Sequence, residues 1–401
     1  MAPDFVHAGV LRAIPAVPGW DQSLQFLADP YRFIGRECRR LGSDVVLARL
    51  MLQPTLCLSG PQAADLFDDR SRVCRADAAL QGLEPLRRHP FNLATRGPAP
   101  TAFLLRYARA EWERLSPRWR GRPRLVLYEA AQEWLVRTGC RWAGLPLAEE
   151  EVPARTRLLV ELFDPAATGL VAQWRAQRAR WAAEGWLGRL VQRQRAGEAV
   201  FPPGTPAAVA CELTDAAGER LPARMAAAEL LAVLRPIVAV SVFVALAAHA
   251  LHLHPAWRPA LAAGRDRELD AFAQEVRRFY PAFAPATGLT CREFVWEGWH
   301  FPRGARVMLD LYGTNHDARA WPEPMEFRPE RFLGAVPGLF DLRPHGGARG
   351  PELTVSLMKF ALQQLAARSR YRVPAQDLRL QMDRTPALPV DRLVVENFSP
   401  A

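Results

Sequence analysis

Apolar residues recur at helical spacing through the middle of the chain and at alternating spacing near its two ends. In the first hundred residues the pattern predicts a helix over 22–40, strands over 45–50 and 55–59, and a helix over 61–69. Helical patterns then predominate from 102 to 254. The first part of the chain therefore combines a small β-element with a long run of helices.

After residue 290 the pattern changes to short alternating segments. The stretch CREFVWEGWHF alternates around Glu297-Gly298, which predicts a hairpin. A strand over 305–311 and a helix over 351–367 follow, and short strands are expected at 371–373, 378–382 and 392–395. We expect one mainly α domain with small β-sheets (α+β) over residues 1–401, because no linker or repeat divides the chain.

One long apolar helix is expected over 225–253. Glu229, Arg235 and Pro236 interrupt its apolar run, which argues against a transmembrane segment. Pro236 removes a backbone hydrogen bond and should bend the helix. Arg235 stays charged, so its burial among leucine, isoleucine and valine requires an anion. That anion is either a ligand carboxylate or an acidic side chain elsewhere in the chain.

A second helical segment, 169–195, is rich in tryptophan and arginine. Trp174 and Trp181 are seven residues apart, so they share one helix face. A packed tryptophan stripe is the favoured interpretation, and a helix lying on a membrane surface is the alternative.

Composition narrows the function classes. The chain has 401 residues and a formal net charge of +10, with Lys359 the single lysine among 52 basic residues. The arginines are spread along the chain and alternate with acids, so no nucleic-acid partner is expected. Six cysteines occur without a C-x-x-C pair, and the N-terminus lacks the pattern of a secretory signal. Free thiols in a cytoplasmic protein are the simplest expectation.

Two segments together carry a specific pattern. QEVRRFYP closes a helix and places Glu275 and Arg278 three residues apart, on one face. The segment FRPERF supplies Arg331, which can complete a cluster of one carboxylate and two guanidiniums. Such a cluster, if buried, tolerates no missing member.

In this order and spacing, the two segments resemble the cytochrome P-450 superfamily. DLYGTNHDARAWPEPMEFRPERF and LMKFALQQLAARSRYRVPAQDLRL further resemble its fatty-acid peroxygenase branch. The resemblance implies the cytochrome P-450 fold, heme b as cofactor, and hydroxylation or decarboxylation of fatty acids with hydrogen peroxide. No flavin or nicotinamide segment is appended, so no fused reductase is expected.

The resemblance also implies roles for individual residues. Arg235, followed by Pro236, would form the catalytic element that holds the fatty-acid carboxylate, which then serves as the acid–base group. Gln81 matches a position that faces the substrate, or is an ordinary polar turn residue. Arg88 and His89 would preserve some of the positive charge that holds the heme propionates.

One departure from the family concerns the iron ligand. A heme-thiolate enzyme needs a cysteine just before its last long helix. Residues 341–353 (DLRPHGGARGPEL) contain none, and no cysteine follows Cys291. His345 lies in this loop and imidazole can ligate heme, but its early position favours an ordinary loop histidine. No metal ligand is therefore assigned.

Three segments that contact heme in the family are short here: 72–80, 84–91 and 341–353. Three hypotheses follow. The chain is an oxidoreductase, a fatty-acid peroxygenase; or it is a heme-less pseudo-enzyme that binds fatty acids on the same fold; or the sequence lacks pieces of these segments.

Overall fold

The computed structural model describes residues 12–75, 100–120, 122–165, 167, 169–215, 217–283, 285–334 and 350–400. It forms two compact units. The smaller unit comprises Met1–Arg87 and Ala284–Pro324, and the larger unit comprises Arg88–Phe283 and Met325–Ala401. The single domain expected over 1–401 stays a prediction.

The smaller unit is built on a five-stranded sheet with the order β1-β2-β8-β5-β3. All neighbouring strands are antiparallel except β2 and β8, which are parallel. The strands are β1 (Val45–Leu50), β2 (Gln53–Leu58), β3 (Val73–Arg75), β5 (Ala286–Thr290) and β8 (Arg306–Leu309). The helices of this unit are α1 (Ser23–Ala28), α2 (Phe33–Leu41), α3 (Pro61–Asp68) and α12 (Leu311–Asn315).

The sheet carries an apolar layer on each face, because side chains alternate along a strand. On β1, Val45 packs into the cluster that contains Phe67 of α3, while Val46 packs into the cluster that contains Phe33 of α2. The predicted hairpin is confirmed as β6 (Phe294–Trp296) paired with β7 (Trp299–Phe301). The predicted helix 22–40 is wrong in one respect: it is divided into α1 and α2 around Pro30, which disfavours a continuous helix.

Cys74 and Cys291 form a disulfide across 217 residues of sequence. β3 and β5 pair in antiparallel register, with Val73 opposite Thr290, and this brings the two Cα atoms to 5.7 Å. The prediction of six free thiols is therefore wrong for this pair. The free thiols are Cys38, Cys57, Cys140 and Cys211, all buried.

The larger unit is helical, with one small sheet. Its helices are α4 (Pro100–Arg120), α5 (Leu127–Ala143), α6 (Val152–Val160), α7 (Gly169–Arg195), α8 (Pro206–Cys211), α9 (Ala223–Leu253), α10 (Arg258–Ala262), α11 (Asp266–Phe279) and α13 (Gly350–Ala367). Short 3-10 helices are η2 (Glu149–Glu151), η3 (Pro255–Trp257) and η4 (Pro329–Phe332). The sheet has the order β4-β10-β9, with β4 (Arg124–Val126), β9 (Ser369–Arg372) and β10 (Val394–Pro400). The strand expected at 378–382 is wrong: only an isolated bridge between Leu380 and Pro389 forms there.

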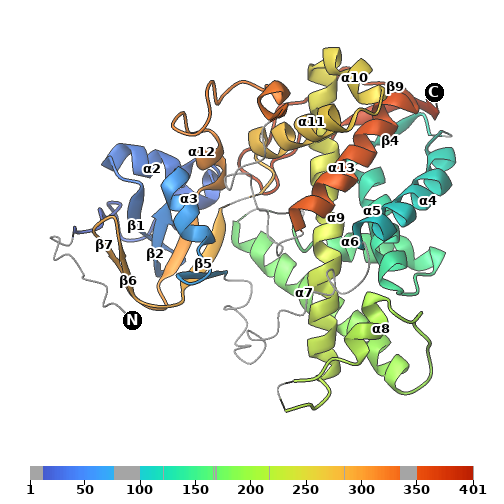
Figure 1. Cartoon of the computed structure of the whole chain (residues 1–401), viewed down its shortest axis with the longest axis horizontal. Coiled ribbons are helices and arrows are strands. Elements are labelled where there is room, and N and C mark those ends of the chain that lie inside the picture. The colour runs from blue at the N-terminus through green and yellow to red at the C-terminus, as the bar shows by residue number, and fades with distance from the viewer. Residues whose placement is uncertain are drawn as a thin grey trace. The chain divides into compact units, whose positions relative to one another are not determined.

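The long helix α9 organises the larger unit. It passes between the other helices, and α5, α7 and α13 all pack against it (Figure 1). The helix is long and apolar enough to cross a membrane, yet 72% of its most apolar window is buried inside the fold. Its apolar character is thus explained by its place in the core.

The tryptophans of α7 do not form the packed stripe that the sequence favoured. Trp186 is 4% exposed, but Trp174 and Trp181 are 61% and 57% exposed. At about 100° per residue, Trp186 lies about 140° around the helix from Trp181. Of these three tryptophans, Trp186 alone is therefore on the core-facing side. The prediction of a packed stripe is wrong for Trp174 and Trp181.

Candidate functional site

Arg235 and Pro236 lie within the apolar helix α9. Their neighbours Leu234 and Ile237 are buried, and Arg235 itself is half-buried. The absence of a side chain at Gly139 lets α5 approach this point, since a Cβ there would lie 3.4 Å from Leu234 and 3.5 Å from Ile237. At about 100° per residue, Arg235 and Pro236 point away from the α5 side of α9.

The half-burial of Arg235 differs from the full burial assumed from the sequence. A partly hydrated guanidinium carries a smaller desolvation cost, so burial alone does not demand a ligand. What the structure provides is a charged, two-pronged donor set among apolar side chains.

A buried charge cluster lies at the end of α11. The Arg278 guanidinium donates to Glu275 Oε1 from Nη2 at 2.7 Å and to Oε2 from Nε at 2.8 Å. Arg331 Nε forms an ion pair with Glu275 Oε2 at 3.2 Å. Glu275 is fully buried, so the two guanidiniums replace the water that its carboxylate loses.

Backbone groups complete this cluster, and the sequence pattern did not reveal them. The N–H of Arg328 donates to Glu275 Oε1 at 2.7 Å. The carbonyl of Glu326 accepts from Arg278 Nη2 at 3.0 Å and from Arg331 Nη2 at 3.2 Å. The cluster thus fastens the FRPERF segment to α11. These contacts involve backbone groups, so they depend on how the chain folds, and no residue type in the sequence predicts them.

Four of the predicted site residues lie outside the described part of the chain. These are Gln81, Arg88, His89 and His345. The structure therefore brings together Glu275, Arg278 and Arg331, and it places Arg235 and Pro236 in α9.

A heme-thiolate site requires a cysteine thiolate close to the start of the last long helix, here α13. Cys74 and Cys291 are bonded to each other, and the four free cysteines lie in α2, β2, α5 and α8. Burial raises the pKa of Cys57 and of Cys140 to about 12, and it also raises the pKa of Cys38 and of Cys211. All four are therefore protonated thiols at neutral pH.

The donor set of the chain does not fit a heme-thiolate. No cysteine follows residue 291 in the sequence, so none lies between that residue and α13. Within the described ranges, no three histidine, cysteine, aspartate or glutamate side chains gather as a metal site. We derive no chemical step through heme for this chain.

A helical unit packed around one long helix, with a buried Glu-x-x-Arg cluster fastened to a later arginine, defines the cytochrome P450 fold. The family model for cytochrome P450 matches residues 268–337. Cytochrome P450SP alpha (CYP152B1), solved with (R)-ibuprofen, is 36% identical with a TM-score of 0.86, covering 95% of this chain and 99% of that chain. The chain belongs to the cytochrome P450 family, in the fatty-acid peroxygenase (CYP152) branch.

Two further relatives show how much of the chain the similarity covers. Wild-type cytochrome P450EX alpha (CYP152N1), solved with myristic acid, is 31% identical with a TM-score of 0.88, covering 97% of this chain and all of that chain. Cytochrome P450 82A1 of Pisum sativum is 36% identical over 91 residues, which is 20% of this chain and 16% of that protein. The chain spans only 13% to 27% of the length of the curated relatives that it matches first.

Proposed function

We propose that this protein binds a fatty acid, with the carboxylate held by Arg235 and the alkyl chain lying along the apolar side chains of α9, and that it does so without heme-thiolate catalysis. The observation that carries the proposal is the place of Arg235, a half-buried cation among buried leucine and isoleucine side chains.

Physical chemistry supports a carboxylate at this position. A guanidinium presents parallel N–H donors that match the two oxygens of a carboxylate. Apolar side chains around one charged group at a fixed place are typical of the residues that bind small amphipathic ligands. The two CYP152 relatives were solved with myristic acid and with ibuprofen, and both ligands are carboxylic acids.

The chemistry of the cysteines favours a binding function over heme-thiolate catalysis. Peroxygenase activity in this family would need heme, and a thiolate pushes the electron density that favours O–O cleavage. The free thiols of this chain are buried and protonated, and no cysteine lies between residue 291 and α13. A fatty-acid-binding pseudo-enzyme fits this donor set better than a peroxygenase does.

Calorimetric titration with myristic acid tests the binding site. Arg235→Ala should weaken binding about 10- to 100-fold, because hydrogen bonds to charged groups contribute about 1.5–3 kcal/mol. Arg120→Ala, an exposed arginine at the end of α4, is the matched control and should bind normally. Methyl myristate lacks the charged group and should bind wild type and Arg235→Ala equally. Equal affinity of both proteins for myristic acid would exclude Arg235 as the anchor.

A second candidate, the hydrogen-peroxide-dependent fatty-acid peroxygenase, is favoured by the Glu275–Arg278–Arg331 cluster and by the likeness to P450SP alpha. An absorption spectrum after expression with heme supplied distinguishes the two. We expect no Soret band. A Soret band with a thiolate-type reduced carbon-monoxide spectrum, together with peroxide-dependent consumption of myristic acid, would replace the binding proposal by the enzymatic one.

A further inference from the structure

The outer face of α7 exposes a row of large apolar side chains. Leu170, Val171, Trp174 and Trp181 all point to solvent, and they occupy one side of the helix. The opposite side, with Ala179, Ala183, Leu187 and Leu190, is buried against the rest of the larger unit, where α7 packs on α9. From Leu170 to Trp181 the row extends about 16 Å, at about 1.5 Å per residue.

The charge of this helix is mostly positive. α7 contains six arginines and a single acid, Glu184. Arg180 and Arg224 both pair with Glu184, at 2.9 Å and 3.3 Å. The exposed face of α7 is therefore positive.

One arginine lies directly beside the tryptophan row, and a second lies further along α7. The guanidinium of Arg178 lies 5.3 Å from the ring centroid of Trp174. Within the described ranges, neither Arg178 nor Arg189 has an ion-pair partner, and both are exposed. They are free to bind an external anion.

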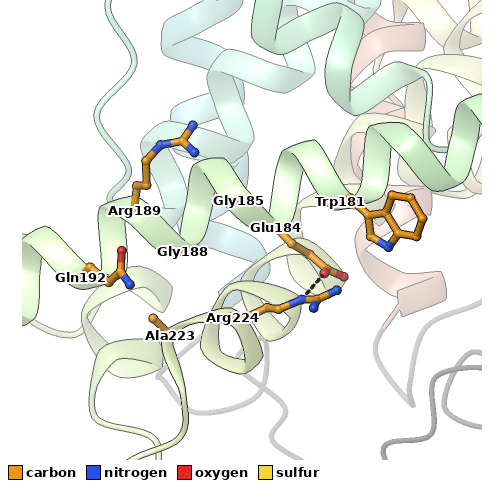
Figure 2. A pocket seen from close by; sticks show the side chains of 8 residues that line it. All are labelled: Trp181, Glu184, Gly185, Gly188, Arg189, Gln192, Ala223 and Arg224. Carbon is orange, nitrogen blue, oxygen red and sulfur yellow. Dashed lines mark hydrogen bonds and ion pairs between the residues drawn. The ribbon is translucent and has the colours of Figure 1, made fainter.

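An open pocket of about 600 Å³ adjoins the row at Trp181, between α7 and the start of α9. Figure 2 shows Arg189 and Gln192 on α7 and Arg224 on α9 around it. Part of the pocket wall is backbone alone, because Gly185 and Gly188 carry no side chain. Glu184 also lines the pocket, and its carboxylate pairs with Arg180 and Arg224. The arginines and Gln192 offer hydrogen-bond donors, and Trp181 offers one aromatic wall, to a compact anionic group.

We propose that the outer face of α7 docks on an anionic lipid bilayer. Tryptophan prefers the interface between headgroups and acyl chains, and Leu170 and Val171 would enter beside Trp174 and Trp181. Arg178 and Arg189 would bind lipid phosphates, and the pocket beside Trp181 would take one headgroup. The occupant is a lipid surface because anionic headgroups complement the positive charge, and their boundary with the acyl chains accommodates the exposed tryptophans. This docking is independent of Arg235 and of heme.

Co-sedimentation with large vesicles tests the proposal. Wild-type protein should sediment with vesicles that contain phosphatidylglycerol and remain free with pure phosphatidylcholine. Arg178→Gln combined with Arg189→Gln should weaken binding about 25-fold, since each arginine near an anionic surface contributes about fivefold. Arg303→Gln, at an exposed turn of the smaller unit, is the matched charge control and should bind like wild type.

The aromatic contribution is tested separately. Trp174→Gln combined with Trp181→Gln should abolish tryptophan quenching by brominated phosphatidylglycerol and should leave the melting temperature unchanged, because both side chains are exposed. Trp20→Gln is the control, since Trp20 is 73% exposed in the smaller unit.

Three results would overturn the proposal: equal loss of binding with Trp20→Gln, equal binding to both vesicle types, or binding unaffected by the α7 variants. Self-association that disappears in the Trp174/Trp181 variant, without vesicle binding, would assign the face to a second copy of the chain instead.

Discussion

The carboxylate of Glu275 and the guanidinium of Arg278 meet through two hydrogen bonds of 2.7 and 2.8 Å, and both side chains are buried. Arg331 reaches the same carboxylate from η4. This pair is the point at which a segment about fifty residues further along the chain is fixed to α11.

Replacing Glu275 by glutamine should therefore destabilise the fold strongly. The change removes the negative charge that pairs with both guanidiniums, and breaking a buried ion pair typically costs about 3–5 kcal/mol. Urea denaturation followed by circular dichroism measures the free energy of unfolding. Glu150→Gln, at an exposed site in η2, is the control and should change it little. A loss below about 1 kcal/mol for Glu275→Gln would show that the cluster does not stabilise the fold.

Because of Asp310, the free energy of unfolding should fall as the pH rises from about 4 to 6. Its carboxyl is buried and accepts a hydrogen bond from the Gly313 N–H at 2.7 Å. Burial raises its pKa from 3.8 to about 6. Between these values the folded state holds a proton that the unfolded state has released, so stability decreases with pH, by about 3 kcal/mol in all. Asp310→Asn should remove this decrease in denaturation curves recorded at several pH values.

His249 should act in the opposite direction. It is buried in α9, with its Nδ1 2.9 Å from the hydroxyl of Tyr280. Burial lowers its pKa from 6.5 to about 4. Between these values the unfolded state binds the proton that the folded state excludes, so stability increases with pH. His249→Asn should therefore steepen the fall attributed to Asp310, whereas Asp310→Asn should leave only the rise. Identical pH profiles for the two variants would contradict both assignments.

The disulfide between Cys74 and Cys291 should be countable in solution. The denatured, unreduced protein should react with a thiol reagent at four cysteines, and after reduction at six. Cys291→Ser should lower stability by about 2–4 kcal/mol, because the bond closes a long loop in the unfolded chain. Cys211→Ser removes a free thiol and serves as the control for thiol counting. Six reactive thiols before reduction would show that the bond does not form.

The sequence by itself determined the features that depend on local order. The Glu275-x-x-Arg278 spacing, the FRPERF segment and the turn at Glu297-Gly298 are each set by neighbours along the chain. These patterns were sufficient for the family and the fold class. The apolar run of α9 with Arg235 and Pro236 was likewise visible, because composition alone marks a core helix that carries one charge.

Only the tertiary structure decided which faces and partners these elements take. Periodicity places Trp174 and Trp181 on one side of a helix, but packing on α9 decides that this side faces solvent. The bond between Cys74 and Cys291 depends on the pairing of β3 with β5 across 217 residues. Arg235 is half-buried because the apolar positions beside it, and not the arginine, face α5. A one-dimensional pattern fixes angles and spacings, whereas burial and long-range pairing arise only when the elements pack together.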